Sequence, residues 1–200
     1  NFHYYISSFP NLGVIHKNMR FFAENNVVSM FPQGNGQGVS GEFGELRSYL
    51  LAKLMWNPYM SEEEYYTMMD EFLAAYYGGG WKEIRTYIDQ LSALALNGPG
   101  HTIYHPPFTA ISETLYRAFA WAADKMWNRA EAAAGDRLEY VQRSRLHWTY
   151  MYLMMYPNEE QGRQLVADVE GRGMAWREGF WHVNMEKSEF YKRPSMWYYE

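Results

Sequence analysis

Amide side chains and glycines are concentrated in one short stretch of this sequence. Residues 31–40 read Phe-Pro-Gln-Gly-Asn-Gly-Gln-Gly-Val-Ser, so that Gln33, Asn35 and Gln37 alternate with glycines. Glycine permits tight turns with positive φ, and amide side chains both donate and accept hydrogen bonds. The stretch lacks the Gly-Lys-Ser/Thr ending of a phosphate-binding loop and has no Rossmann spacing. It therefore predicts a turn-rich loop that could cradle a ligand.

The histidines form a weaker pattern. His101 and His105 are four residues apart, which is the spacing of zinc ligands on a helix. However, Pro99, Pro106 and Pro107 disfavour a helix there, and no His-Glu-x-x-His motif occurs. The Gly-x-Ser-x-Gly motif of serine hydrolases is also absent. We therefore predict no metal site and no cofactor.

The composition argues against several classes of protein. Lys and Arg together number 18, the net charge is −5, and no basic stripe is present for nucleic acid. The lack of cysteine excludes disulfides and thiolate sites. No apolar run approaches the ~20 residues of a membrane span. Aromatic residues make up 18% of the chain, which favours a bulky core; platforms for sugar rings or for a protein partner are the alternative.

Two elements are predicted before the glycine-rich stretch. Apolar residues recur at helical spacing from Leu12 to Phe22 and predict a helix over 12–25, with Asn11 as its N-cap. The Val-Val-Ser-Met-Phe run at 27–31 predicts a short strand. A helix followed by a strand is the pattern of an α/β unit.

After the glycine-rich stretch the chain is almost wholly helical in pattern. Capping residues and breakers predict helices over 44–56, 62–77, 81–96, 110–134, 137–156 and 159–171. Ser61 with Glu64 has the pattern of a capping box, and Thr109 and Asn158 are further predicted N-caps.

The helix over 137–156 is rich in aromatic residues. It also contains Arg143 and Arg145, which we expect to pair with acidic residues of a neighbouring helix. The aromatic tail over 173–200 is too apolar for a plain disordered segment, so we expect it to pack on the helices.

Four runs of the sequence carry a resemblance to a known family: Phe9-Pro-Asn-Leu12, Met30-Phe31-Pro-Gln-Gly34, the residues 45–58 and the residues 70–78. They resemble the C-terminal half of domain of unknown function 4838. The Leu-Ala-Lys-Leu-Met-Trp-Asn-Pro run at 51–58 is the most specific part. The resemblance continues through Ile103-Tyr104 and the later aromatic helix, and so spans roughly residues 1–160.

That family is similar to glycoside hydrolases of the α-glucuronidase and hexosaminidase type. The resemblance implies a (β/α)8 barrel followed by a helical domain. Residues 1–41 would be the end of the barrel, with an initial strand or loop, the helix over 12–25, the strand over 27–31 and the glycine-rich loop. Residues 42–200 would be the helical C-terminal domain. The expected fold is therefore mainly α, a helical bundle with a short N-terminal α/β remnant.

The resemblance also indicates where a ligand would bind. Barrel chemistry takes place at the C-terminal ends of the strands and in the loops that follow them. The residues at those positions, expected to hydrogen-bond sugar hydroxyls or to stack on a sugar ring, are His3, Tyr4, Tyr5, Gln33 and Asn35. Pro32 stands where the family usually has an acidic residue, which speaks against a catalytic carboxylate there.

Glu42 and Glu45 are the nearest carboxylates to the loop. They are three residues apart, so a helix would place them on one face. Glycoside hydrolysis uses two carboxylates ~5–9.5 Å apart. We favour a different interpretation, in which both acids complement the dipole of the helix that follows. The catalytic residues therefore stay unknown, and we expect no glycosidase activity from the isolated chain.

The predicted function is that of the C-terminal part of a glycoside-hydrolase-like protein, whose helical domain supports a carbohydrate-binding barrel. Its expected partners are carbohydrate, the rest of its own barrel and, in a homodimer, a second copy; nucleic acid and membrane are not expected. The alternative is a non-enzymatic helical interaction or carbohydrate-binding module. The sequence leaves the compartment open, with secretion or a bacterial periplasm as one option.

Overall fold

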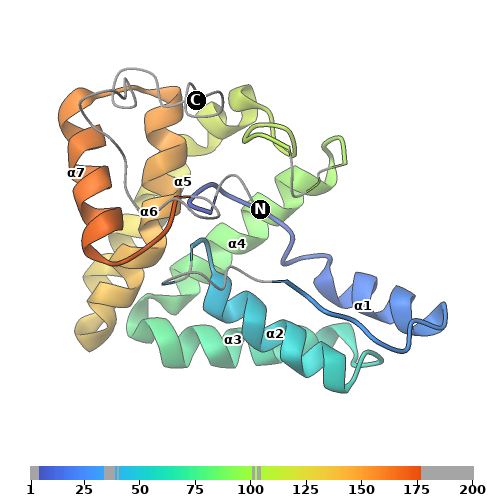
Figure 1. Cartoon of the computed structure of the whole chain (residues 1–200). Helices are drawn as coiled ribbons and strands as arrows, with labels where there is room; N and C mark the ends of the chain where they lie inside the picture. The colour runs from blue at the N-terminus through green and yellow to red at the C-terminus, as the bar shows by residue number, and fades with distance from the viewer. Residues whose placement is uncertain (1–4, 34–38, 40, 101, 103–104, 177–200) are drawn as a thin grey trace.

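The computed structural model of the chain describes residues 5–33, 39, 41–100, 102 and 105–176. Within these residues the chain is mainly α-helical, as the sequence predicts (Figure 1). The helices are α1 (Ile15–Glu24), α2 (Gly44–Trp56), α3 (Glu62–Tyr77), η1 (Gly78–Gly80), α4 (Trp81–Leu96), α5 (Glu113–Ala133), η2 (Gly135–Arg137), α6 (Leu138–Met155) and α7 (Glu159–Gly171). None of these helices is both long and apolar enough to cross a membrane.

The helices α2, α3, α4 and α7 have the predicted bounds, and side-chain caps account for the starts of α3 and α7. At the start of α3 the Ser61 hydroxyl accepts the backbone N–H of Glu64 at 3.1 Å, and the Glu64 carboxylate accepts the Ser61 N–H at 2.7 Å. This confirms the capping box. Asn158 caps α7 by accepting the N–H of Gln161 at 2.9 Å, as its amide side chain predicts.

The start of α5 differs from the prediction. Thr109 is not its cap, because its hydroxyl donates to the Pro106 carbonyl at 2.9 Å and the chain turns through Phe108 at a φ of +67°. Ser112 caps α5 instead, accepting the N–H of Leu115 at 3.3 Å. The helix therefore begins three residues later than the sequence indicates.

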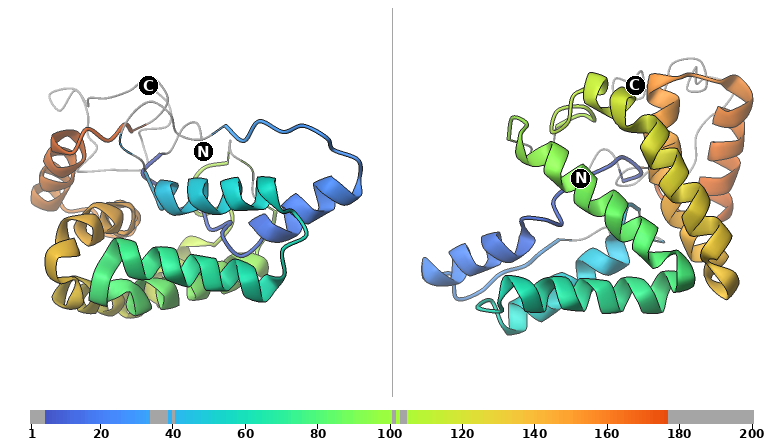
Figure 2. Two further views of the ribbon diagram at one scale, coloured as in Figure 1. Left: turned by 90° about the horizontal axis from the view of Figure 1, so that it is seen from below. Right: turned by 180° about the vertical axis from the view of Figure 1, so that it is seen from behind.

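The helices pack in two sets that share one core (Figures 1 and 2). α6 lies between α5 and α7, while α2 and α3 pack together, and α4 connects the two sets by contacting both α3 and α5. The centre is filled by large side chains that are no more than 1% exposed, among them Trp127, Trp148, Tyr65, Tyr77 and Tyr87. Many of the aromatic side chains in the described residues therefore fill the core, as the sequence favours, whereas Trp56, Trp121 and Phe31 are exposed.

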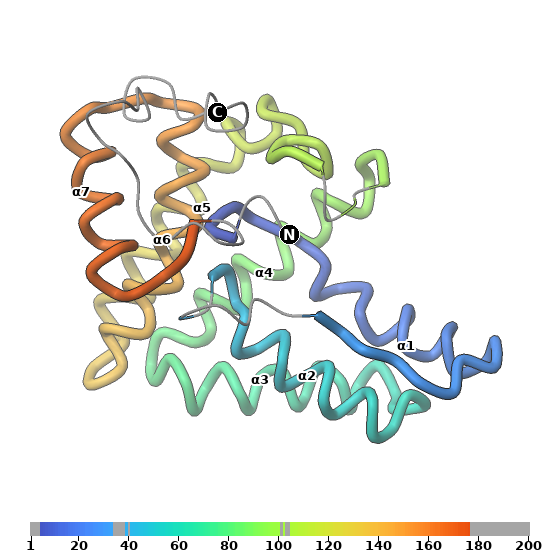
Figure 3. The backbone as a smooth tube through the Cα atoms, in the orientation of Figure 1, coloured from blue at the N-terminus to red at the C-terminus, as the bar shows by residue number. Residues whose placement is uncertain are grey.

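The predicted strand over 27–31 is not formed in the structure. α1 is followed by an extended segment that runs back from its far end towards the middle of the molecule (Figures 1 and 3). Val28 is 98% exposed and Phe31 is 86% exposed. A strand needs a neighbouring strand to hydrogen-bond its backbone, and the described part of the chain offers none beside this segment. The composition of residues 27–31 predicts an extended backbone, which is present, but the predicted strand is not formed.

The beginning of the chain packs into the helical core. Ile6 and Leu12 are 1% and 3% exposed, and the Tyr65 hydroxyl donates to the Leu12 carbonyl at 2.6 Å. α1 begins at Ile15, not at Leu12, and its N-cap Val14 has no capping side chain. The division of the chain into residues 1–41 and 42–200 stays a prediction.

Candidate functional site

Three distant segments of the chain meet beside the ends of the glycine-rich stretch. The Tyr5 N–H donates to the Trp176 carbonyl at 3.0 Å, and the Glu42 N–H approaches the Tyr5 carbonyl at 3.4 Å. The Val39 N–H donates to the Gly173 carbonyl at 3.3 Å. We call this meeting point the junction. It holds the backbone on both sides of residue 40 in a fixed position.

Gly41 is required for the junction to close. A Cβ atom at this position would lie 2.0 Å from the carbonyl oxygen of Tyr5. No side chain can be accommodated at that distance without moving backbone. Gly41, which directly follows the glycine-rich stretch, therefore serves a close contact between two segments.

Beneath the junction, Glu42 and Arg47 form a buried ion pair. The Glu42 carboxylate is 4% exposed and lies 2.6 Å from Nη2 of Arg47. The same guanidinium donates to the Glu42 carbonyl at 2.6 Å, to the Phe9 carbonyl at 3.1 Å and to Oδ1 of Asn11 at 2.9 Å. Arg47 thus ties the segment before α1 to the start of α2.

Burial raises the pKa of the Glu42 carboxyl, and the charge of Arg47 acts in the opposite direction. A carboxylic acid with a raised pKa is what a general acid requires. However, this side chain is almost completely enclosed and already bonded to Arg47. Its role is therefore to hold the segments together, which differs from the predicted interaction with a helix dipole.

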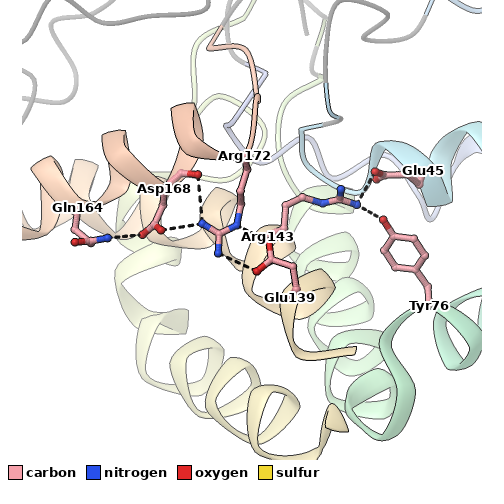
Figure 4. A network of polar contacts seen from close by, with 7 residues as sticks. All are labelled: Glu45, Tyr76, Glu139, Arg143, Gln164, Asp168 and Arg172. Carbon is pink, nitrogen blue, oxygen red and sulfur yellow. Dashed lines mark hydrogen bonds and ion pairs between the residues drawn. The ribbon is translucent and has the colours of Figure 1, made fainter. Parts of the chain in front are cut away.

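Glu45 belongs to another network, which connects helices at the surface (Figure 4). Arg143 of α6 donates to Glu45 at 2.7 Å and also to the Tyr76 hydroxyl. Glu139, four residues before Arg143 on α6, pairs with Arg172, and Arg172 also pairs with Asp168, each at 2.8 Å. These pairs join α2, α3, α6 and the end of α7.

Both arginines of the aromatic helix are paired with acids of other helices, as predicted. Arg143 reaches Glu45 of α2, and Arg145 lies 2.8 Å from Glu131 of α5. Glu42 and Glu45 thus pair with two different arginines, Glu42 with Arg47 of α2 and Glu45 with Arg143 of α6.

The structure places two of the five predicted sugar-binding residues. Tyr5 is half-buried at the junction, where its backbone is hydrogen-bonded on both sides. Gln33 is exposed at the end of the extended segment after α1. His3, Tyr4 and Asn35 lie outside the described residues. Their assignment to a binding site stays a prediction.

His147 is a buried histidine near the junction, and no motif in the sequence marks it. The backbone of Phe43 has a φ of +46°. Its ring packs among buried aromatic side chains, with its centroid 5.0 Å from that of the His147 ring. Nδ1 of His147 contacts the Ser144 carbonyl, which can only accept, so this nitrogen carries the proton. Nε2 then accepts from the Tyr87 hydroxyl at 3.0 Å. Burial lowers the pKa of this imidazole to about 3, so it is neutral near pH 7.

No group of side chains suited to a metal ion occurs in the part of the chain that the structure describes. His147 is engaged in the core. His16 is stacked on Tyr65, with ring centroids 4.7 Å apart, and it lies 3.9 Å from Glu62. His101, one member of the pair considered above, lies outside the described residues.

A pocket of about 300 Å³ was also not anticipated from the sequence. It lies between the segment before α1, the end of α4 and the loop before α5, and its lining includes Asn11 and Ser92. The breaks Pro10-Asn11 and Asn97-Gly-Pro-Gly100 on its two sides mark where the chain bends around it. Asn11 connects the pocket to Arg47.

Residues 1–89 match the model of the family described as Domain of unknown function (DUF4838). The DUF4838 match includes the predicted sugar-binding residues, the junction glycine Gly41 and the Glu42–Arg47 pair. It ends within α4, so the resemblance expected as far as residue 160 is supported only over this first part. No curated protein and no solved structure matches the chain.

Proposed function

We propose that this chain is the C-terminal part of a glycoside-hydrolase-like protein, in which the helices support a carbohydrate-binding barrel. The observation that carries the proposal is the extended segment after α1. Val28 and Phe31 project apolar side chains into solvent, and residues 28–33 make no backbone hydrogen bond to the rest of the described chain. A barrel strand separated from its neighbours would have these two properties.

The helix before this segment supports the same interpretation. α1 buries only Ile15, His16 and Met19, while Phe21 and Phe22 are 58% and 38% exposed. Exposed apolar surface next to an unpaired extended segment is expected where a barrel helix and strand would meet their neighbours. Gln33 lies at the end of the segment, where a barrel places its ligand contacts.

The first test compares this chain with the longer form that the proposal expects, produced from the complete reading frame of its gene. Amide hydrogen exchange is followed at Val28, Ser29 and Phe31. The proposal expects these amides to exchange at nearly the unprotected rate in this chain, and at least a hundredfold more slowly in the longer form, since strand pairing protects them. Equal exchange in the two forms would contradict the barrel.

The second test addresses carbohydrate. p-Nitrophenyl glucuronide and p-nitrophenyl N-acetylglucosaminide are offered to the longer form and to this chain. We expect hydrolysis or binding only by the longer form, weakened by Gln33→Ala and unchanged by Gln90→Ala, a control at an exposed position of α4. Hydrolysis by this chain alone would refute the assignment of the catalytic residues to another part of the protein.

A non-enzymatic binding module is the second candidate, and one surface favours it. At the end of α2, Trp56 is 92% exposed and Tyr59 is 59% exposed. Arg20 of α1 donates to the carbonyls of Tyr59 and Met60 at 2.8 and 2.9 Å, which fixes the position of this turn. Aromatic rings held rigidly at a surface can stack on a sugar or a partner. Binding that is lost in Trp56→Ala and kept in Gln33→Ala would support this candidate over the barrel.

A further inference from the structure

The pocket beside Asn11 has the properties of a small-molecule site. Its volume of about 300 Å³ is at the lower end of ligand pockets in proteins. The walls are mostly apolar and include Phe9, Val14, Ala95 and Pro99, and no charged side chain lines it. The pocket shares no residue with the positions to which sugar binding is assigned.

Two polar side chains that line this pocket, Asn11 and Ser92, keep hydrogen-bond donors that no described residue uses. Oδ1 of Asn11 accepts from Nε of Arg47 at 2.9 Å, and Arg47 is itself fixed by Glu42. The amide plane of Asn11 is therefore held in one orientation. Its Nδ2 group, and the hydroxyl of Ser92, have no hydrogen-bond partner among the described residues. Both groups can donate a hydrogen bond to a molecule in the pocket.

We infer that this pocket binds a small, uncharged, mostly apolar molecule that carries an acceptor oxygen, such as the carbonyl of a ketone, ester or amide. A charged group would lose part of its hydration here without meeting an opposite charge, because no charged side chain lines the pocket. A free sugar ring has more hydroxyls than the two side chains can satisfy, and those turned towards the apolar walls would be left unpaired. One carbonyl oxygen matches the donors of Asn11 and Ser92. Because Arg47 holds the Asn11 amide in place, little ordering is required on binding.

Acetophenone is the probe that tests this inference, because it combines an apolar ring with one carbonyl. It is titrated into the isotope-labelled chain, and NMR shifts are followed at the Asn11 side-chain amide and at the backbone amides of Ser92 and Ala95. Ethylbenzene keeps the ring and the methyl group but lacks the carbonyl oxygen, and it is expected to bind about tenfold more weakly. Benzoate and methyl α-D-glucopyranoside are expected to bind more weakly than acetophenone.

Two variants separate binding from folding. Asn11→Asp keeps the acceptor that Arg47 needs but removes the Nδ2 donor, so acetophenone affinity should fall about tenfold while the melting temperature is maintained. Ala95→Phe fills the pocket and should abolish the shifts, whereas Ala93→Phe, at an exposed position of the same helix, should leave them unchanged. The inference is overturned if acetophenone causes no shifts, if Asn11→Asp binds it as well as the original chain does, or if the glucoside or benzoate binds more tightly.

Discussion

Acid is expected to destabilise the chain through His147, whose imidazole is 2% exposed. In the neutral form Nδ1–H donates to the Ser144 carbonyl and Nε2 accepts from the Tyr87 hydroxyl. A second proton would have to be placed on Nε2, and it would break the hydrogen bond that Nε2 accepts from the Tyr87 hydroxyl. The resulting positive charge would be buried among aromatic rings. Burial therefore lowers the pKa of this group from 6.5 to about 3, and the hydrogen bond to Ser144 only partly opposes the shift.

The magnitude follows from the two pKa values. The folded-state pKa of His147 is below the unfolded-state value of 6.5, so its stabilising contribution is complete above pH 6.5 and is lost as the pH falls towards 3. Each pH unit costs about 1.4 kcal/mol. The loss in the free energy of unfolding is therefore roughly 2 kcal/mol at pH 5 and roughly 4 kcal/mol at pH 3. The whole stability of a domain is ~5–15 kcal/mol, so this one group has a large effect.

Urea unfolding followed by tryptophan fluorescence, at intervals from pH 7.5 to pH 4.5, measures the effect. In His147→Gln the new amide oxygen can still accept from Tyr87, but the titrating group is gone. We expect this variant to be less stable at neutral pH, with a pH dependence shallower than the original by about 1.4 kcal/mol per unit. Tyr87→Phe keeps the buried imidazole and should keep the steep slope. Parallel curves for the original chain and His147→Gln, or an NMR titration that shows His147 protonated in the folded state near pH 6, would refute the reasoning.

Two further predictions concern the junction, and urea unfolding tests both. Arg47→Met leaves the carboxylate of Glu42 buried without its partner and should lower the free energy of unfolding by about 3–5 kcal/mol. Arg163→Met, in an exposed pair of α7, should lower it by no more than about 1 kcal/mol. Equal losses would contradict a special role for the buried pair. Gly41→Ala should cost at least about 2 kcal/mol because its Cβ would meet a backbone carbonyl. Gly100→Ala meets no atom within 4 Å and should change stability by less than about 0.5 kcal/mol, so similar effects of the two glycine substitutions would argue against the close contact.

The sequence predicted the helices best where their ends are set by local chemistry. The Ser61 cap and the Asn57-Pro58 stop act within a few residues of themselves, and the bounds of α2 and α3 agree with the structure. The start of α5 was misjudged because Thr109 and Ser112 are both good caps. Only the course of the chain around Phe108 decides between them.

The parts that the sequence could not predict depend on distant partners. Residues 27–31 have the composition of a strand, but whether they form one depends on a neighbouring strand elsewhere. Glu42 resembles any acid near a helix start, and its burial depends on Arg47 and on the segment at Phe9. The pocket likewise arises where Asn11 and Ser92 meet, and they are far apart in the sequence.

The hydrogen bond between Tyr5 and Trp176 has a consequence for how the chain acquires its fold. It joins segments on the order of 170 residues apart, and a contact of such long range forms slowly because a large loop must be closed. On the ribosome, the segment at Tyr5 emerges long before its partner has been synthesised. The helices between them can form beforehand, so the closing of the junction is expected to be a late step. A substitution at Gly41 should therefore accelerate unfolding more than it slows folding.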